Sequence, residues 1–176
     1  VDEEQTEEVV PKISEFANSQ NRVNAADFFV NHPFHVRMED FSRRIYAPSP
    51  DGTFRETRWF YERARGQFND ARSRLAPAQR KKFDLEHPRA QLFSKTDLAK
   101  FLHVWEQKPD KVSLGAQKNF AHFAHGVGQA WKKNEDNFNE AFFREAVAKA
   151  IVFKSTEKIV SNQPWYEGGY RANIVA

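Results

Sequence analysis

Apolar residues recur every three or four positions along almost the whole of this 176-residue chain. That spacing places them along one side of an α-helix, whereas a half-buried strand requires strict alternation. The stripes are rich in aromatic side chains, because the chain has 17 Phe and 4 Trp, and 29% of its residues are charged. We therefore predict a mainly α fold, an irregular helical bundle with at most a small β-ribbon, formed as one domain over residues 1–176.

The individual helices are predicted from these stripes and from the residues that commonly begin and end helices. One stripe lies within residues 9–17, and a helix begins at Asn24, a favourable N-cap residue. Ser94, with Asp97 three residues later, forms a capping-box start for another helix. The other stripes are Val36, Phe41 and Ile45 within residues 34–45; Tyr61, Ala64, Phe68, Ala71 and Leu75, ending near Pro77; Leu98, Phe101, Leu102 and Trp105; and Ala116, Phe120, Phe123, Val127 and Ala130.

The longest predicted helix spans Phe138–Ile159. Its middle, Ala146–Phe153, is apolar almost all round, which predicts a helix at the centre of the bundle. The clearest turn is Pro48–Gly52, where Pro, Ser, Asp and Gly follow one another. The best strand candidate follows at Thr53–Phe60, and we expect it to form the small β-ribbon.

The composition excludes several classes of protein. The absence of Cys excludes disulfides, thiolate nucleophiles and cysteine-ligated metals. No apolar run is long enough to span a membrane, and the acidic first residues do not resemble a signal peptide, so we expect a cytoplasmic protein. Both ends look cut, because Val1 replaces an initiator Met and residues 170–176 read like an interrupted helix. We interpret the chain as a fragment of a longer protein.

Three stretches, Ser19–Phe29, Arg58–Phe68 and Phe93–Phe120, carry motifs whose order and spacing match a known family pattern. In these motifs the chain resembles the abortive infection phage resistance (AIPR) family over about residues 14–124. The Asn-Gly-Gly-Gln-Thr type of motif that usually precedes this region is absent, consistent with a missing N-terminal portion. The resemblance implies a role in bacterial resistance to phage, and the family offers no catalytic mechanism to transfer.

A second resemblance concerns the short polar string Asn18, Gln20, Asn21 and Arg22, followed by Asp27. It is similar to the Asn-x-Gln-Arg box of ParB-like nucleotide-binding domains, which implies contact with nucleotide phosphates and a divalent ion. An arginine fork and a neutral amide oxygen fit those roles. A polar helix end is the alternative interpretation of the same residues.

The segment Phe54–Lys82 is strongly basic. Nine of its residues are Arg or Lys and three are acidic, a net charge of +6 in a chain whose total is +3. Basic residues interleaved with aromatic ones are typical of contact with nucleic-acid phosphates and bases. The candidate phosphate contacts in this segment are Arg58, Arg63, Arg65, Arg72 and Arg74.

The helical spacing divides these arginines into two groups. Arg65 and Arg72 fall beside the apolar stripe, near Glu62, where ion pairs that lock the fold explain them as well as a ligand does. Arg63 and Arg74 are expected to point away from the stripe.

Lys95 is a further candidate, because it lies at a predicted helix start, where a phosphate can bind. Asp97 offers the alternative that its own carboxylate caps the same N–H groups. His122 and His125 stand three residues apart, but they lack further ligands nearby, so we assign them to a solvated helix face and predict no metal site.

Three hypotheses of function follow. The first is a non-catalytic helical module of a defence protein that contacts nucleic acid or phosphate through its basic segment. The second is part of a nucleotide-dependent enzyme, completed by the remainder of the parent chain next to Asn18–Arg22. The third is a structural or homo-oligomerising domain. The residues assign neither a cofactor nor a reaction, and they exclude a membrane partner.

Overall fold

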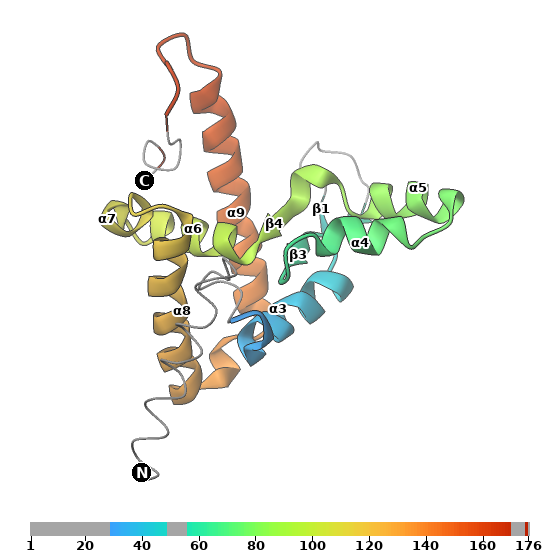
Figure 1. Ribbon diagram of the computed structural model, residues 1–176, viewed down its shortest axis with the longest axis horizontal. Coiled ribbons are helices and arrows are strands. Elements are labelled where there is room, and N and C mark those ends of the chain that lie inside the picture. The colour runs from blue at the N-terminus through green and yellow to red at the C-terminus, as the bar shows by residue number, and fades with distance from the viewer. Residues whose placement is uncertain (1–28, 49–55, 170–174, 176) are drawn as a thin grey trace, which may run out of the picture.

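The computed structural model describes residues 29–48, 56–169 and 175. The helices predicted before residue 29 and most of the turn at Pro48–Gly52 lie outside these residues. The described part of the chain is mostly helical, which confirms the mainly α prediction (Figure 1). Its seven α-helices are α3 (Pro33–Arg44), α4 (Gln67–Ser73), α5 (Pro77–Glu86), α6 (Lys95–Trp105), α7 (Pro109–Val112), α8 (Ala116–Lys133) and α9 (Glu140–Ser161). Three 3-10 helices complete them: η1 (Phe29–Asn31), η2 (Arg89–Gln91) and η3 (Glu135–Asn137).

The described strands form two short pairs. β1 (Ala47–Pro48) and β2 (Glu56–Thr57) make an antiparallel ribbon, which places β2 inside the predicted strand segment. β3 (Phe60–Glu62) and β4 (Leu92–Ser94) pair in parallel, with Tyr61 opposite Phe93. The parallel pair was not predicted, and it requires the intervening chain to cross over through α4, α5 and η2.

The stretch from Tyr61 to Leu75 is not the single helix that its spacing predicts. Tyr61 belongs to β3, and α4 begins only at Gln67. Gly66 precedes α4 with φ +84°, a conformation that a side chain strains, so the helix cannot extend back toward Tyr61. The apolar positions at steps of three and four are thus divided between a buried strand and a short helix.

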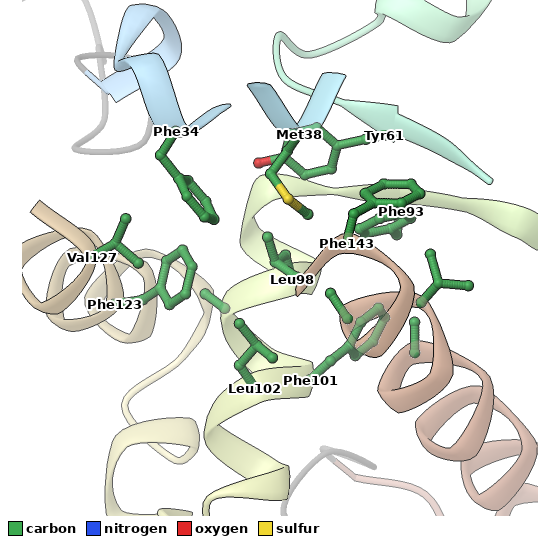
Figure 2. Packing of buried hydrophobic residues seen from close by; sticks show 14 of the residues in the cluster. Phe34, Met38, Tyr61, Phe93, Leu98, Phe101, Leu102, Phe123, Val127 and Phe143 are labelled. Atoms are coloured by element: carbon green, nitrogen blue, oxygen red, sulfur yellow. The ribbon is translucent and has the colours of Figure 1, made fainter. Parts of the chain in front are cut away.

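The core lies where α3, α6, α8 and α9 meet beneath the β3–β4 pair (Figure 2). Phe34 and Met38 of α3 point toward Leu98 and Leu102 of α6, and Phe123 and Val127 of α8 close one side. The predicted stripes therefore bury most of their members. Val36 and Trp105 are exceptions, 46% and 56% exposed, and Ala116 is exposed as well.

α9 is the longest described helix, and Asn139 caps its N-terminus by accepting hydrogen bonds from Ala141 N and Phe142 N. Only one side of it is buried, with Ala146, Val147, Ala150 and Phe153 facing α6 and α3. Val152, in the segment that is apolar almost all round, is 51% exposed. The predicted central position therefore holds for one face of α9 only, because in the described part of the chain α6 and α3 pack on that face and Val152 on the other is half exposed.

A second aromatic cluster lies under α4 and α5, which pack side by side at the edge of the molecule (Figure 1). Phe68 meets Phe60 at 5.0 Å and Phe83 at 5.3 Å between ring centroids. His87 stacks on Phe83 at 4.7 Å. This cluster holds α4 and α5 against β3.

The one-sided burial of α9 predicts a difference between two neighbouring substitutions. Ala150 is fully buried and Val152 is half exposed. An aspartate at position 150 places an unpaired charge in the core and should lower the free energy of unfolding by roughly 3 kcal/mol or more. Val152→Asp should change it by less than about 1 kcal/mol. Urea unfolding of both variants is the measurement, and equal losses would contradict the assigned face.

Candidate functional site

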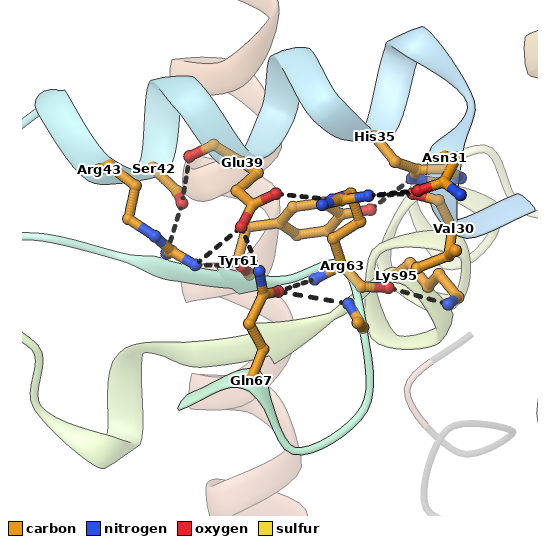
Figure 3. Close-up of polar contacts among 11 residues, drawn as sticks. Val30, Asn31, His35, Glu39, Ser42, Arg43, Tyr61, Arg63, Gln67 and Lys95 are labelled. Atoms are coloured by element: carbon orange, nitrogen blue, oxygen red, sulfur yellow. Dashed lines mark hydrogen bonds and ion pairs between the residues drawn. The ribbon is translucent and has the colours of Figure 1, made fainter. Parts of the chain in front are cut away.

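Glu39 of α3 lies at the centre of a polar network that joins α3 to the chain after β3 (Figure 3). One carboxylate oxygen accepts from Arg63 Nε at 2.6 Å. The other accepts from the Gln67 side-chain amide and lies 3.5 Å from Arg43. The Gln67 oxygen in turn accepts from the backbone N–H of Arg63 and of Ala64. The network therefore shapes the bend between β3 and α4.

Arg63 is the most strongly held of the predicted arginines. Besides Glu39, its guanidinium donates to the Val30 carbonyl at 2.8 Å and to the Asn31 side chain at 2.9 Å. The prediction placed Arg63 on a helix, pointing away from its apolar stripe; the helix is absent here, because Arg63 follows strand β3 and α4 begins only at Gln67. Arg63 ties three segments together.

Two buried groups beside this network are kept uncharged. His35 Nδ1 and the Tyr61 hydroxyl share a hydrogen bond of 2.6 Å. Burial, with Lys95, His32 and Arg63 nearby, lowers the pKa of His35 to about 3. Burial also raises the pKa of Tyr61 well above its ordinary value. The pair thus forms a hydrogen bond between two neutral groups. Burial favours the neutral form of each group, because a charged form would lose its hydration.

The other predicted arginines of the basic segment divide by their partners. Arg58 pairs with Glu86 at 3.3 Å and lies over the Tyr46 ring. Arg72 pairs in fork geometry with Asp84, at 2.7 and 2.8 Å, rather than near Glu62. Arg74 and Arg65 are exposed and form no ion pair within the described part of the chain. Arg65 therefore does not lock the fold as a core-edge ion pair.

A cleft of about 420 Å³ opens between the bend after β3 and the start of α6. We call it the arginine cleft. Its charged lining comprises four cationic and two acidic side chains, a net charge of +2: Arg63, Arg65, Arg89, Lys95, Glu62 and Asp97. The structure thus brings together three of the predicted residues, Arg63, Arg65 and Lys95, and leaves Arg58, Arg72 and Arg74 outside the lining of this cleft.

The two acids of the arginine cleft are already engaged by the fold. Glu62 accepts from the backbone N–H of Phe68 at 3.1 Å. Asp97 accepts from Ser94 N and Oγ and from Lys100, which confirms the predicted capping box. Burial raises the pKa of Asp97, but Lys100 and Ser94 outweigh it and hold the pKa below the usual value. Asp97 is thus a carboxylate committed to the helix start, and it leaves less room there for a phosphate.

The cations of the cleft are engaged to different degrees. Lys95 is 5% exposed and donates to the Arg63 carbonyl at 2.8 Å. Arg89 donates to the Asn69 side chain at 2.8 Å. Among the described residues neither Arg65 nor Arg89 forms an ion pair with a carboxylate, which leaves two guanidinium groups that an anion can reach.

Sequence reasoning missed Arg89 and Glu39. Arg89 lies seven positions beyond the basic segment and follows Pro88, so the charge count did not include it. Glu39 is 24 positions before Arg63, a separation at which no local spacing rule applies. His122 and His125 are exposed on α8 as predicted. The nucleotide-binding candidates Asn18, Gln20, Asn21 and Arg22 lie outside the described residues.

Comparison with known proteins identifies the family. A family model described as AIPR protein matches residues 1–176. The chain belongs to the AIPR family. Membership associates the chain with abortive infection and phage resistance, as the motifs in Arg58–Phe68 and Phe93–Phe120 implied. No curated protein and no solved structure matches the chain. In the described part of this AIPR chain, no helix is both long and apolar enough to cross a membrane.

The different partners of Arg63 and Arg65 predict different responses to lysine. Lysine keeps the charge, but its donors share one nitrogen and cannot reach Glu39 and the Val30 and Asn31 oxygens as the separate Nε and Nη1 of Arg63 do. Arg63→Lys should lower the free energy of unfolding by about 1–3 kcal/mol. Arg65→Lys should change it by less than about 0.5 kcal/mol. Thermal and urea unfolding of the two variants test this prediction. A larger loss of stability in Arg65→Lys than in Arg63→Lys would show that Arg65 is the arginine that stabilises the fold.

The buried neutral His35 predicts that stability falls in acid. In the unfolded chain histidine titrates near pH 6.5, whereas the folded pKa is about 3, so unfolding takes up a proton between these values. The free energy of unfolding should therefore decrease by up to about 1.4 kcal/mol per pH unit as pH falls from about 6 to 3.

His35→Gln is the control for this slope. A glutamine amide can still pair with the Tyr61 hydroxyl but does not titrate. Unfolding curves measured from neutral pH down to pH 4 should show that the free energy of unfolding decreases less steeply with falling pH in the variant than in the unchanged protein. Equal slopes for both proteins would assign the acid sensitivity to other groups.

Proposed function

We propose that this AIPR chain contacts nucleic acid, and that the arginine cleft binds backbone phosphates as its contribution to phage resistance. The observation that supports the proposal most directly is which charged side chains of the cleft already have partners. Its acids are held by backbone N–H groups and by Lys100, while Arg65 and Arg89 have no carboxylate partner among the described residues. Guanidinium groups are well suited to phosphate because they donate in a planar fork.

The ion pairs narrow the proposal from the whole basic segment to part of it. Arg58, Arg63 and Arg72 are paired with Glu86, Glu39 and Asp84. Part of the +6 charge is therefore neutralised by nearby carboxylates, and these three arginines support the fold. Arg65 and Arg89, with the buried Lys95 behind them, remain available for a ligand.

Binding of this kind is electrostatic, which determines its expected strength and salt dependence. A small number of phosphate contacts gives weak, non-specific binding, on the order of micromolar or poorer at physiological salt. The logarithm of the affinity should fall linearly with the logarithm of the salt concentration. Because phage nucleic acid is met inside the bacterial cell, we infer a cytoplasmic site of action from this function.

The test compares two double charge reversals of equal size. Arg65→Glu with Arg89→Glu removes both available guanidinium groups from the cleft, and we expect affinity for labelled DNA or RNA to fall by about tenfold or more at low salt. Arg74→Glu with Lys81→Glu makes the same change of charge on exposed residues that do not line the cleft. The affinity of that control variant for the same DNA or RNA should fall by less than about threefold.

Fluorescence anisotropy at about 50 and 200 mM salt measures both the affinities and the salt slope. Thermal melts should show that both double variants remain folded, because none of the four positions forms an ion pair in the described residues. Equal losses from both variants would show that only bulk charge matters. Absence of binding by the unchanged protein to DNA and RNA at low salt would overturn the proposal.

A further inference from the structure

A second cavity, of about 430 Å³, adjoins the arginine cleft. It is lined by Phe68, Arg72, Asp84, His87 and Arg89, and we call it the His87 pocket. Arg89 lines both cavities. Arg89 lies over the Phe68 ring, 5.7 Å from the ring centroid to the guanidinium carbon, and is anchored by Asn69. A ligand that extends past Arg89 would therefore contact both cavities.

His87 is the residue of this pocket that packing does not explain. It is 94% buried, since its exposed fraction is 6%. Both of its ring nitrogens are buried and neither makes a hydrogen bond of ordinary geometry among the described residues, although the Phe83 backbone lies close enough to the ring to raise its pKa. Unpaired polar atoms destabilise a fold, and an apolar side chain of similar size would fill the same space without them. The fold therefore retains an imidazole here at a disadvantage to its own stability.

The surroundings of His87 combine aromatic and polar groups. Its ring stacks on Phe83 with an interplanar angle of 26°, and Phe68 continues the aromatic surface along the lining. Arg72 and Asp84, each 42% exposed, hold one another in fork geometry on the same lining. Burial lowers the pKa of His87, so near neutral pH the ring presents one donor and one acceptor. Flat aromatic and guanidinium surfaces with donors and acceptors around them complement a nucleobase.

We propose that the His87 pocket takes a nucleobase whose phosphate lies in the arginine cleft, with Arg89 between them. The ligand is then a nucleotide, either free or as one unit of a single strand. A base paired and stacked inside a duplex cannot enter such a pocket unless it is first extruded. This inference rests on the proposed function, because the phosphate contact belongs to the arginine cleft.

The first experiment needs no variant. Anisotropy compares a labelled single-stranded oligonucleotide, an abasic oligonucleotide of equal length and charge, and a duplex. We expect the base-bearing single strand to bind about tenfold more tightly than the abasic one, because stacking of a base contributes in addition to the phosphates. Equal affinity for base-bearing and abasic strands overturns the base pocket and leaves the phosphate cleft standing. Absence of binding to any of the three overturns the proposed function itself.

A matched pair of substitutions locates the effect. His87→Leu removes the imidazole from the pocket, and His122→Leu makes the same change on the exposed face of α8. We expect His87→Leu to reduce the preference for the base-bearing strand by about fivefold or more without changing affinity for the abasic strand. Its melting temperature should be equal to or higher than that of the unchanged protein, because the unpaired nitrogens are gone. An unchanged preference in His87→Leu overturns the assignment of the base to this pocket.

A competition assay separates the two sources of the ligand. Displacement of the labelled strand by mononucleotides, well beyond that by inorganic phosphate, supports the proposal and identifies a free nucleotide as the ligand. A base preference that mononucleotides do not abolish supports it with a strand as the ligand. Displacement by inorganic phosphate as effective as by mononucleotides overturns the contact with the base.

Discussion

The ion pair between Glu39 and Arg63 is the interaction on which the arrangement of the site depends. It joins a carboxylate of α3 to the first residue after β3 at 2.6 Å, with both side chains about four-fifths shielded from water. Charges removed from water are stable only when they are well paired, and here Gln67 and Arg43 also donate to Glu39, while the Val30 carbonyl and the Asn31 side chain accept from Arg63 (Figure 3). The network fixes the bend between β3 and α4, and the cleft opens on that bend.

The same bend divides two arginines that are close in sequence into opposite roles. Arg63 follows the end of β3, and its side chain points to α3, where its hydrogen bonds with Glu39 and Val30 stabilise the fold. Arg65 lies just before Gly66, whose positive φ turns the chain into α4, and its guanidinium remains outside the core. A helical wheel assigns these residues the reverse roles, because it assumes a continuous helix through them. The location of Gly66, rather than the charge pattern, decides which arginine can meet a ligand.

The features that could be predicted from the sequence are those that depend on neighbouring residues. Ser94 and Asp97 form their capping box within one helical turn, and the stripes of α6 and α8 describe faces that local spacing defines. The features that were missed depend on distant residues. Tyr61 is a strand residue because it pairs with Phe93, 32 positions later, and Arg63 is fixed by Glu39, 24 positions earlier. Periodicity indicates which face of a helix is apolar, but it does not identify the element that will pack against that face.

Two physical roles are therefore combined in one small region, and they constrain one another. Lys95 donates to the carbonyl of Arg63, which connects the start of α6 to the bend and to the Glu39 network. An anion that binds Arg65 and Arg89 also approaches this connection, because Lys95 and Arg63 line the same cleft. A ligand that binds the folded state alone stabilises it by mass action. The paired arginines supply a rigid frame, and the proposed phosphate contact falls to the two guanidinium groups that form no ion pair in the described residues. The fold can keep such cations at its surface because solvent covers them until a ligand arrives.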